Sequence, residues 1–238
     1  MNFKLIALIP ARSGSERIKN KNIKLLNKKP LLAYSILSAK KTNLFDKIIV
    51  STDSTKYKDI AVKYGAEVPC LRKKKYSGSS SPDFFWVKDL LEHFEKKNIF
   101  FSHFFILRPT SPFRTYKTII RAWRKFCNSK CDSLRAVEQI KQRPEKMWTL
   151  DQNYLKPYIK KLKIINNQPH YNMQSKVFKK IFIQNASLEI SKVSVLKKYK
   201  TITGKKIVPF FTKNHEGFDI NEKQDFNMAK ILVKKIIF

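Results

Sequence analysis

The sequence predicts a doubly wound, mostly parallel α/β sheet, because short apolar runs alternate with segments of helical spacing from residue 3 to residue 138. The apolar runs contain few polar residues, which is typical of strands that are buried on both faces of a parallel sheet. A chain of 238 residues is long enough to bury a core of its own. We therefore expect a single domain over residues 1–238, with its ligand at the carboxyl ends of the strands.

The predicted strands and helices follow one another in strict alternation. Strands are expected at 3–9, 47–52, 67–72, 103–109 and 131–138. Helices are expected at 30–41, 54–65, 81–97 and 116–126. Because the connections between parallel strands are right-handed, this order places helices on both faces of the sheet.

The region 141–180 breaks the alternation. It mixes turn residues with aromatic ones, shows little periodicity and is too long for a simple connection. We expect an inserted lobe or a subunit contact there. Regular structure is expected to return at 180–191 and 206–211, followed by a closing helix from Asn221 to about Lys235.

The composition narrows the classes of function. The formal net charge is +32, but the lysines are spread over the whole chain, so we expect no specific nucleic-acid partner. The same charge favours attraction of small polyanions such as a nucleoside triphosphate. No apolar run approaches the roughly 20 residues of a membrane helix, so we expect no membrane partner. The three cysteines lack zinc-site spacing and suit a cytoplasmic location.

The segment after the first predicted strand gathers small and cationic residues. Ser13, Gly14 and Ser15 offer amide and hydroxyl donors and allow a ligand to approach the backbone. Arg12 and Lys21 add positive charge. These groups can cradle a polyphosphate, although the segment contains neither GxxxxGK[ST] nor GxGxxG. A solvated basic loop is the alternative, but the position after the first strand favours a ligand site.

The segment IPARSGSERIKNKNI at residues 9–23 resembles the nucleotide-binding sequence of the acylneuraminate cytidylyltransferases, which make CMP-activated sialic acids. Related enzymes for legionaminic, pseudaminic and Kdo-type acids share this form. Six further blocks resemble the family in the same order along nearly the whole chain: DKIIVSTDS, GAEVPCLR, SGSSSPD, LRPTSPFRT, IQNASLEIS and GFDINEKQDF.

The resemblance implies a Rossmann-like nucleotidyltransferase that couples CTP to a nine-carbon α-keto sugar acid, giving the CMP-sugar and pyrophosphate. Such a displacement depends on positioning and on neutralising phosphate charge. Arg12 and Lys21 match phosphate-contacting positions and are the catalytic candidates. Arg72 falls where the family holds cytidine, although a place in the solvated run with Lys73 is the alternative. The implied nucleotide-binding residues are Arg12, Ser13, Gly14, Ser15, Lys21, Asn22, Arg72 and Ser81.

The sugar-binding residues that the resemblance implies are Arg108, Thr110, Ser111, Arg114, Asn185 and Glu189. Arg108 stands where sialic acid enzymes typically carry Gln, so it either pairs with the sugar carboxylate or indicates a different acyl group. Glu189 stands where that branch has Tyr. The departure at Glu189 favours the branch for legionaminic acid and similar sugars. In the family, the region 141–180 builds the dimer contact and part of the sugar pocket.

The metal ligands that the resemblance implies are Asp219 and Asn221, for Mg2+. The family commonly has two aspartates at this spacing, and here Asn221 replaces the second. Asn221 can offer a carbonyl oxygen, and a role as helix N-cap is the alternative. Glu16 replaces a residue that is usually Lys and weakens the positive field of the loop.

The resemblance thus predicts a cytoplasmic homodimer that binds CTP and a nonulosonic acid. Two alternatives remain. One is CMP activation of Kdo or another sugar, although the metal-binding block of the Kdo branch is missing after the fourth strand. The other is a catalytically impaired basic protein on the same fold, which binds nucleotides or nucleic acid.

Overall fold

The computed structural model describes residues 4–140, 142–160 and 168–235. Residue 3 of the first expected strand, and residues 141 and 161–167 of the expected lobe, lie outside these ranges. The chain separates into two compact units, which we call unit 1 (Met1–Val137 with Asn185–Phe238) and unit 2 (Glu138–Gln184).

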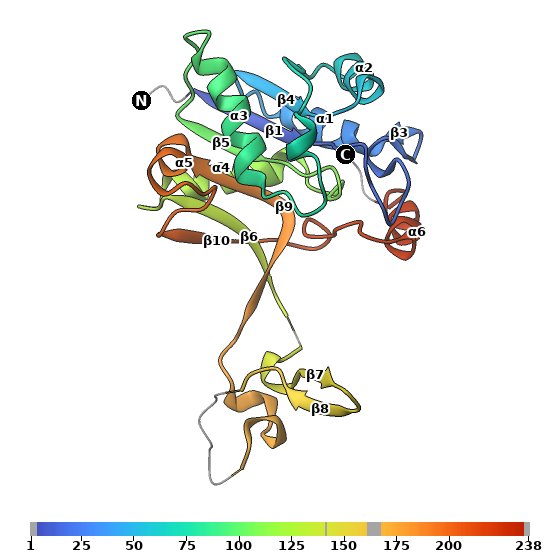
Figure 1. The fold of residues 1–238 in the computed structure, drawn as a ribbon, viewed down its shortest axis with the longest axis vertical. Coiled ribbons are helices and arrows are strands. Elements are labelled where there is room, and N and C mark those ends of the chain that lie inside the picture. The colour runs from blue at the N-terminus through green and yellow to red at the C-terminus, as the bar shows by residue number, and fades with distance from the viewer. Residues whose placement is uncertain (1–3, 141, 161–167, 236–238) are drawn as a thin grey trace. The chain divides into compact units, whose positions relative to one another are not determined.

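In the described residues, unit 1 is built on a six-stranded sheet in the order β10-β6-β9-β5-β1-β4 (Figure 1). Strand β1 is parallel to β4 and to β5, β10 is parallel to β6, and β9 is antiparallel to β5. The strands span Leu5–Pro10 (β1), Lys47–Ser51 (β4), His103–Ile106 (β5), Ser133–Gln139 (β6), Phe182–Lys192 (β9) and Ile207–Phe211 (β10). A mostly parallel α/β sheet confirms the predicted fold class.

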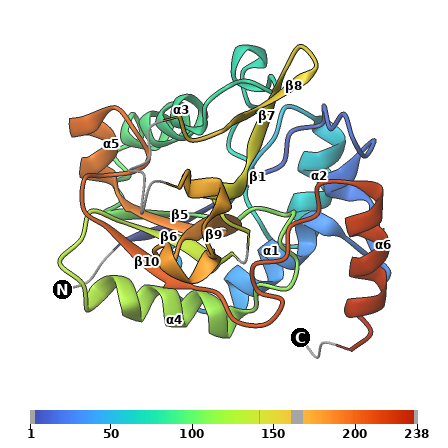
Figure 2. The same cartoon turned by 90° about the horizontal axis from the view of Figure 1, so that it is seen from below.

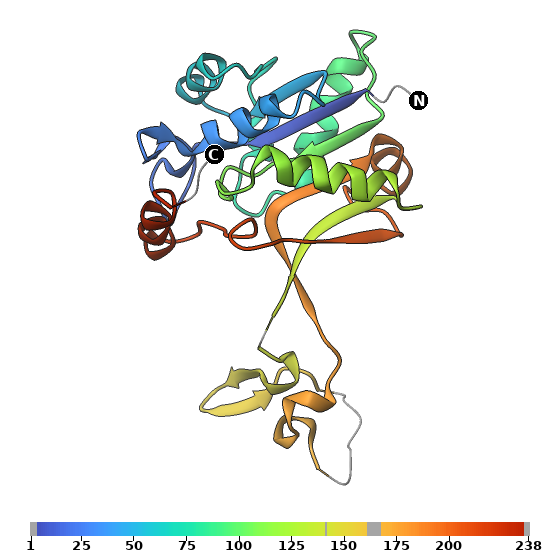
Figure 3. The same cartoon turned by 180° about the vertical axis from the view of Figure 1, so that it is seen from behind.

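Helices cover both faces of this sheet, as Figures 2 and 3 show. They span Leu31–Lys41 (α1), Thr55–Lys63 (α2), Asp83–Glu95 (α3), Tyr116–Cys127 (α4), Val193–Tyr199 (α5) and Lys223–Leu232 (α6). In β1, Ala7 and Ile9 pack in one core with α1, α2 and α4, whereas Ile6 and Leu8 pack in the other with α3 and α5. Because side chains alternate along a strand, one apolar run supplies both cores.

The strand expected at 67–72 is wrong. Only Glu67 forms a bridge, to Ile49 of β4, and the chain then leaves the sheet. Pro69 explains the failure, because it has no amide hydrogen to donate to a ladder of hydrogen bonds. The segment beyond it turns toward the carboxyl end of β4, where Arg72 donates its amide to the carbonyl oxygen of Thr52 at 2.7 Å.

The structure contains several short elements that the sequence did not predict, because they have too few residues to show a period. They are the strands Leu25–Leu26 (β2) and Lys29–Pro30 (β3), helix α5, and 3-10 turns at Lys21–Ile23, Lys74–Tyr76, Pro144–Lys146, His170–Asn172 and Ser175–Val177. Among the described residues, no helix combines the length and apolar content needed to cross a membrane.

Unit 2 contains an antiparallel hairpin of β7 (Trp148–Asp151) and β8 (Tyr154–Pro157), drawn in yellow in Figure 1. The turn between the strands places Gln152 at a φ of 52°. Leu150 and Leu155 face each other across the hairpin and are 72% and 63% exposed. The hairpin therefore carries an apolar surface that nothing in the described part of unit 2 covers.

Candidate functional site

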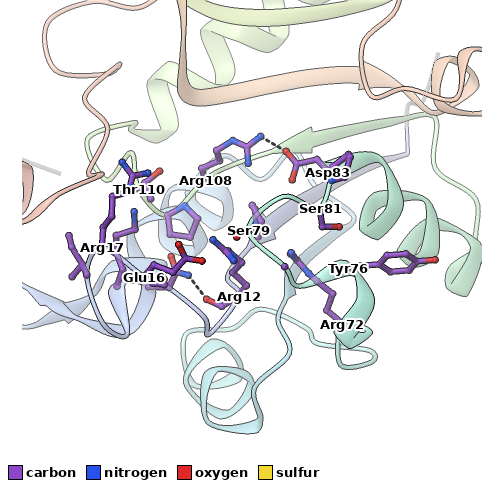
Figure 4. A pocket seen from close by; sticks show the side chains of 18 residues that line it. Arg12, Glu16, Arg17, Arg72, Tyr76, Ser79, Ser81, Asp83, Arg108 and Thr110 are labelled. Carbon is purple, nitrogen blue, oxygen red and sulfur yellow. Dashed lines mark hydrogen bonds and ion pairs between the residues drawn. The ribbon is translucent and has the colours of Figure 1, made fainter. Parts of the chain in front are cut away.

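A cavity of about 550 Å³ opens in unit 1 at the carboxyl ends of β1 and β5 (Figure 4). Its lining comes from three segments, which follow β1, run from Arg72 to Asp83, and follow β5. Ligands of doubly wound folds bind at this edge of the sheet. Figure 4 shows Arg12 between Glu16 and Arg17 on one side and Arg72 and Tyr76 on the other.

The cavity brings together half of the residues that the sequence indicated. Those that line it are Arg12, Ser15, Lys21, Asn22, Arg72, Ser81, Arg108 and Thr110. Those that do not line it are Ser13, Gly14, Ser111, Arg114, Asn185, Glu189, Asp219 and Asn221. Seven of these eight form polar contacts with other residues of unit 1, and the eighth, Gly14, is exposed.

Arg12 and Lys21 are anchored by backbone carbonyl groups rather than by carboxylates. Arg12 donates from its guanidinium to the carbonyl oxygen of Ser77 at 3.3 Å, and Lys21 donates from Nζ to that of Ile220 at 2.8 Å. Burial lowers the pKa of Lys21, and the nearby Asp219 carboxylate opposes this shift. Neither cation forms an ion pair within the described ranges, so their charge remains available to an anionic ligand.

Asn22 is buried and closes the loop after β1 by donating from Nδ2 to the carbonyl oxygen of Arg12 at 3.0 Å. Ser13, by contrast, turns away from the cavity. Its amide donates to Oδ1 of Asp53 at 2.8 Å, and its Oγ lies 3.1 Å from Oδ2. We did not predict Asp53 from the sequence, although its place at the end of the second strand was a signal.

Arg72 is fixed against the end of β4. It donates from Nε to Oγ of Ser51 at 2.9 Å and from a terminal nitrogen to the Ser51 carbonyl oxygen at 3.0 Å. The guanidinium also lies 4.6 Å from the ring centroid of Trp86. Burial lowers the pKa of Arg72 to about 10. These contacts exclude the alternative in which Arg72 belongs to the solvated run that begins at Lys73.

Arg108 is compensated by two carboxylates. The same guanidinium nitrogen contacts Asp83 at 2.5 Å and Glu189 at 2.9 Å, and Glu189 also pairs with Arg135 at 2.6 Å. Burial disfavours the charge of Arg108, but Glu189 and Asp83 outweigh it and raise the pKa above the ordinary value. Two arginines and two carboxylates thus form an electrically balanced cluster, of which Arg108 and Asp83 line the cavity.

Arg114 lies behind the loop that follows β5, and only 1% of it is exposed. It donates to the carbonyl oxygens of Ser187 and Arg108, and to Oγ of Ser35 at 2.6 Å. Burial lowers its pKa to about 9. Ser111 is fully buried beside it. In β9, Asn185 donates from Nδ2 to Thr212 at 2.9 Å.

Asp219 and Asn221 precede α6. Oδ2 of Asp219 accepts a hydrogen bond from Nδ2 of Asn221 at 2.8 Å, whereas Oδ1 is buried with no hydrogen-bond partner in the described structure. The N-cap of α6 is Glu222, so the alternative role of Asn221 as N-cap is excluded. The described ranges hold no cluster of three or more His, Cys, Asp or Glu that fits a metal ion. One free carboxylate oxygen fits Mg2+ only when phosphate and water supply most of its ligands.

Further lining residues were not predicted. Arg17, Tyr76, Ser79 and Asp83 all face the cavity. Asp83 was not recognised as a site residue, because it lies in the first turn of a predicted helix, where an acidic residue is expected from the helix alone. Tyr76 gave no sequence signal, because its ring is placed by stacking on Phe85 at a centroid distance of 5.8 Å.

Comparisons with known proteins agree with this geometry. A family model described as cytidylyltransferase matches residues 6–83. CMP-N,N'-diacetyllegionaminic acid synthase of Legionella pneumophila is 36% identical over 180 residues, covering 74% of this chain and 77% of its own length. Pseudaminic acid cytidylyltransferase of Campylobacter jejuni is 27% identical over 232 residues, covering 98% of this chain and 97% of its own length.

Among solved structures, CMP:2-keto-3-deoxy-manno-octonic acid synthetase complexed with CTP has a TM-score of 0.69. It covers 98% of this chain and 99% of its own, at 12% identity, so this likeness concerns the fold alone. The family model and the relative at 36% identity identify this α/β fold, with its cationic cavity at the carboxyl ends of the strands, as a nucleotidyltransferase. This chain belongs to the cytidylyltransferase family.

Proposed function

We propose that this protein couples CTP to a nine-carbon α-keto sugar acid and releases the CMP-sugar and pyrophosphate. The observation that carries the proposal is the cavity in which Arg12 and Lys21 lie without a carboxylate partner in the described chain. The relative at 36% identity is named for CMP-N,N'-diacetyllegionaminic acid, which supports a legionaminic-type substrate.

In the proposed reaction, a hydroxyl oxygen of the sugar acid attacks the α-phosphorus of CTP. The new oxygen–phosphorus bond forms as the bond to pyrophosphate breaks, and the hydroxyl proton passes to solvent. Negative charge then gathers on the leaving group, so fixed cations favour the transition state. Arg12 and Lys21 are assigned to this task as catalytic residues, and Arg17 adds charge at the same end of the cavity.

The cytidine part is assigned to the end of the cavity formed by Arg72 and Ser81. Arg72 has two of its nitrogens bound to Ser51, which fixes the plane of the guanidinium. Its remaining donors can form the paired hydrogen bonds to a carbonyl group that a lysine cannot offer.

The sugar acid is assigned to the side formed by Arg108 and Thr110. Because Asp83 and Glu189 balance the charge of Arg108, this wall is poorly suited to a carboxylate. It is better suited to a neutral group such as an acylamino substituent, which supports the second of the two roles open to Arg108. The sugar carboxylate is then left to the uncompensated cations at the other side.

Magnesium is part of the proposal. Asp219 would hold it through the free Oδ1, with Asn221 fixing the other carboxylate oxygen. When bound, the ion supplies further neutralisation of phosphate charge. The short distance from Asp219 to the Lys21 site follows from the contact of Lys21 with Ile220, the next residue in the chain.

We also propose a cytoplasmic homodimer. The exposed apolar hairpin of unit 2 supports a contact with a second copy, because large apolar patches on a surface mark interaction sites. Cys70, Cys127 and Cys131 are free thiols, which suits a reducing compartment.

The test of the site is a calorimetric titration with CTP of the wild-type chain and of two variants, Arg12→Ala and Lys21→Ala. Each variant should weaken CTP binding about tenfold or more, and a tenfold change corresponds to a loss of about 1.4 kcal/mol of binding free energy. Lys19→Ala is the matched control, because Lys19 is exposed in the same segment and does not line the cavity. Equal affinities in all four proteins would overturn the site assignment.

A further inference from the structure

The carboxyl end of β4 is hydrogen-bonded to two of the segments that line the cavity. The carbonyl oxygen of Ser51 accepts from the amide of Ala11 at 2.9 Å, and that of Thr52 accepts from the amide of Arg72 at 2.7 Å. Ser51 also binds the Arg72 side chain through two hydrogen bonds. The end of this strand thus fixes the start of the loop after β1 relative to Arg72.

Asp53 completes this frame on the side of the loop. Its two carboxylate oxygens contact the amide and the hydroxyl group of Ser13, so they fix the residue directly after Arg12. Asp53 is only partly exposed and does not line the cavity. It therefore reaches a ligand through Ser13 rather than by direct contact.

The negative charge of Asp53 is unfavourable for the binding of an anionic ligand at this place. The negative charge of Asp53 favours the charged form of Arg72 and so partly opposes the lowering of the Arg72 pKa by burial. A carboxylate so close to a site for a polyanion repels the ligand, since like charges at short range disfavour binding. If Asp53 acted by charge alone, its removal would strengthen the binding of CTP.

We propose that Asp53 is a positioning residue for the triphosphate, which holds Ser13 and thereby directs Arg12 and Ser15 into the cavity. The inference rests on the proposed function, because it takes CTP as the ligand. It predicts the opposite sign from a charge effect: loss of the Asp53 carboxylate weakens CTP binding although it removes a repulsive charge.

The experiment measures dissociation constants for CTP and for cytidine at one fixed salt concentration. Asp53→Ala should weaken CTP binding about tenfold or more and change cytidine binding by less than about threefold, because only the phosphates depend on the loop. Asp53→Asn should remain within about threefold of wild type for CTP. Its amide oxygen still accepts from the Ser13 amide, and its amide nitrogen can donate to the Ser13 hydroxyl group.

Ser54→Ala is the matched control for stability. Ser54 caps α2 by accepting from the amide of Tyr57 at 3.4 Å, and it has no contact with Ser13 in the described structure. Its loss should lower the Tm, since caps stabilise helices, and leave the affinity for CTP unchanged. An effect on CTP in this variant equal to that of Asp53→Ala would reduce the inference to general destabilisation and overturn it.

The remaining outcomes separate the inference from the proposed function. Tighter or unchanged CTP binding by Asp53→Ala, with the wild type binding normally, would overturn the inference alone. So would an Asp53→Asn variant as weak as Asp53→Ala. A wild-type chain that bound no CTP would overturn the proposed function and the inference together.

Discussion

At the scale of single residues, three arginines of this chain are stabilised in different ways. Arg72 is bound to Ser51 and lies against Trp86, Arg108 is paired with carboxylates, and Arg114 is buried among backbone carbonyls and a hydroxyl group. The partners of each arginine determine whether its charge and its hydrogen-bond donors remain available to a ligand. Arg72 offers directed donors, whereas the charge of Arg108 is already satisfied.

Replacing Arg72 with lysine should weaken CTP binding about tenfold, because a lysine cannot keep both contacts with Ser51 and also donate to a ligand. Titration with CTP measures the change. Lys74→Ala is the control, since Lys74 is exposed two residues away and does not line the cavity. Unchanged affinity in Arg72→Lys would mean that the positive charge at this position, which lysine keeps, and not the geometry of the guanidinium, is what the residue contributes.

Replacing Glu189 with glutamine should lower the free energy of unfolding by about 2 kcal/mol, because Arg108 and Arg135 lose a shared, buried carboxylate. Urea denaturation measures the change. Glu67→Gln removes an exposed ion pair with Lys47 and should cost less than about 1 kcal/mol. The charge balance around Arg108 is contradicted if Glu189→Gln lowers the free energy of unfolding no more than Glu67→Gln does.

At the scale of elements, β5 buries a histidine at its first residue. His103 is 6% exposed, and burial, with a smaller contribution from Lys192, lowers its pKa from 6.5 to about 4. The unfolded chain therefore binds more protons than the folded chain between these values. Stability from this group is present above pH 6.5 and is lost as the pH falls toward 4.

His103→Asn should accordingly flatten the fall of stability between pH 6.5 and pH 4 relative to the wild type. The measurement is the free energy of unfolding of both proteins at several pH values in this window. Parallel curves for the two proteins would show that other groups cause the acid sensitivity.

The elements differ in how well the sequence predicts them. The apolar run of β1 and the helical spacing of α3 survive in the structure, because each packs the surface that its period indicates. The expected strand at 67–72 fails at Pro69. The contact of Asp53 with Ser13 joins residues 40 positions apart, and no local pattern encodes such a contact.

The same distinction applies to the candidate site. Arg12 and Lys21 line the cavity because they follow β1 at the carboxyl edge of the sheet, which the order of elements already implies. Arg72 joins them through its hydrogen bonds to Ser51 and Thr52, although the strand expected before it does not form. Arg114 and Glu189 lie beside the same segments but behind the wall. Which face of a loop a side chain occupies depends on tertiary packing, and sequence spacing does not determine it.

At the scale of the whole molecule, the exposed hairpin of unit 2 is the candidate contact between copies. Leu150 and Leu155 form an apolar pair on it. Changing both to Asp should convert a dimer to a monomer in sedimentation equilibrium, because charges at the core of an apolar interface remain unpaired. Phe100→Asp, at a 56% exposed site in unit 1, is the control and should leave the mass unchanged. A wild-type monomer would contradict the proposed contact.

The proposed reaction also makes a prediction for the molecule as a whole, and one measurement tests it most directly. Pyrophosphate release is followed with CTP and Mg2+ against a panel of sialic, legionaminic, pseudaminic and Kdo acids. We predict release that requires both CTP and a sugar acid, fastest with a legionaminic-type acid. Silence with every acid, in a chain that still binds CTP, would contradict the proposal that this cavity couples CTP to a nonulosonic acid.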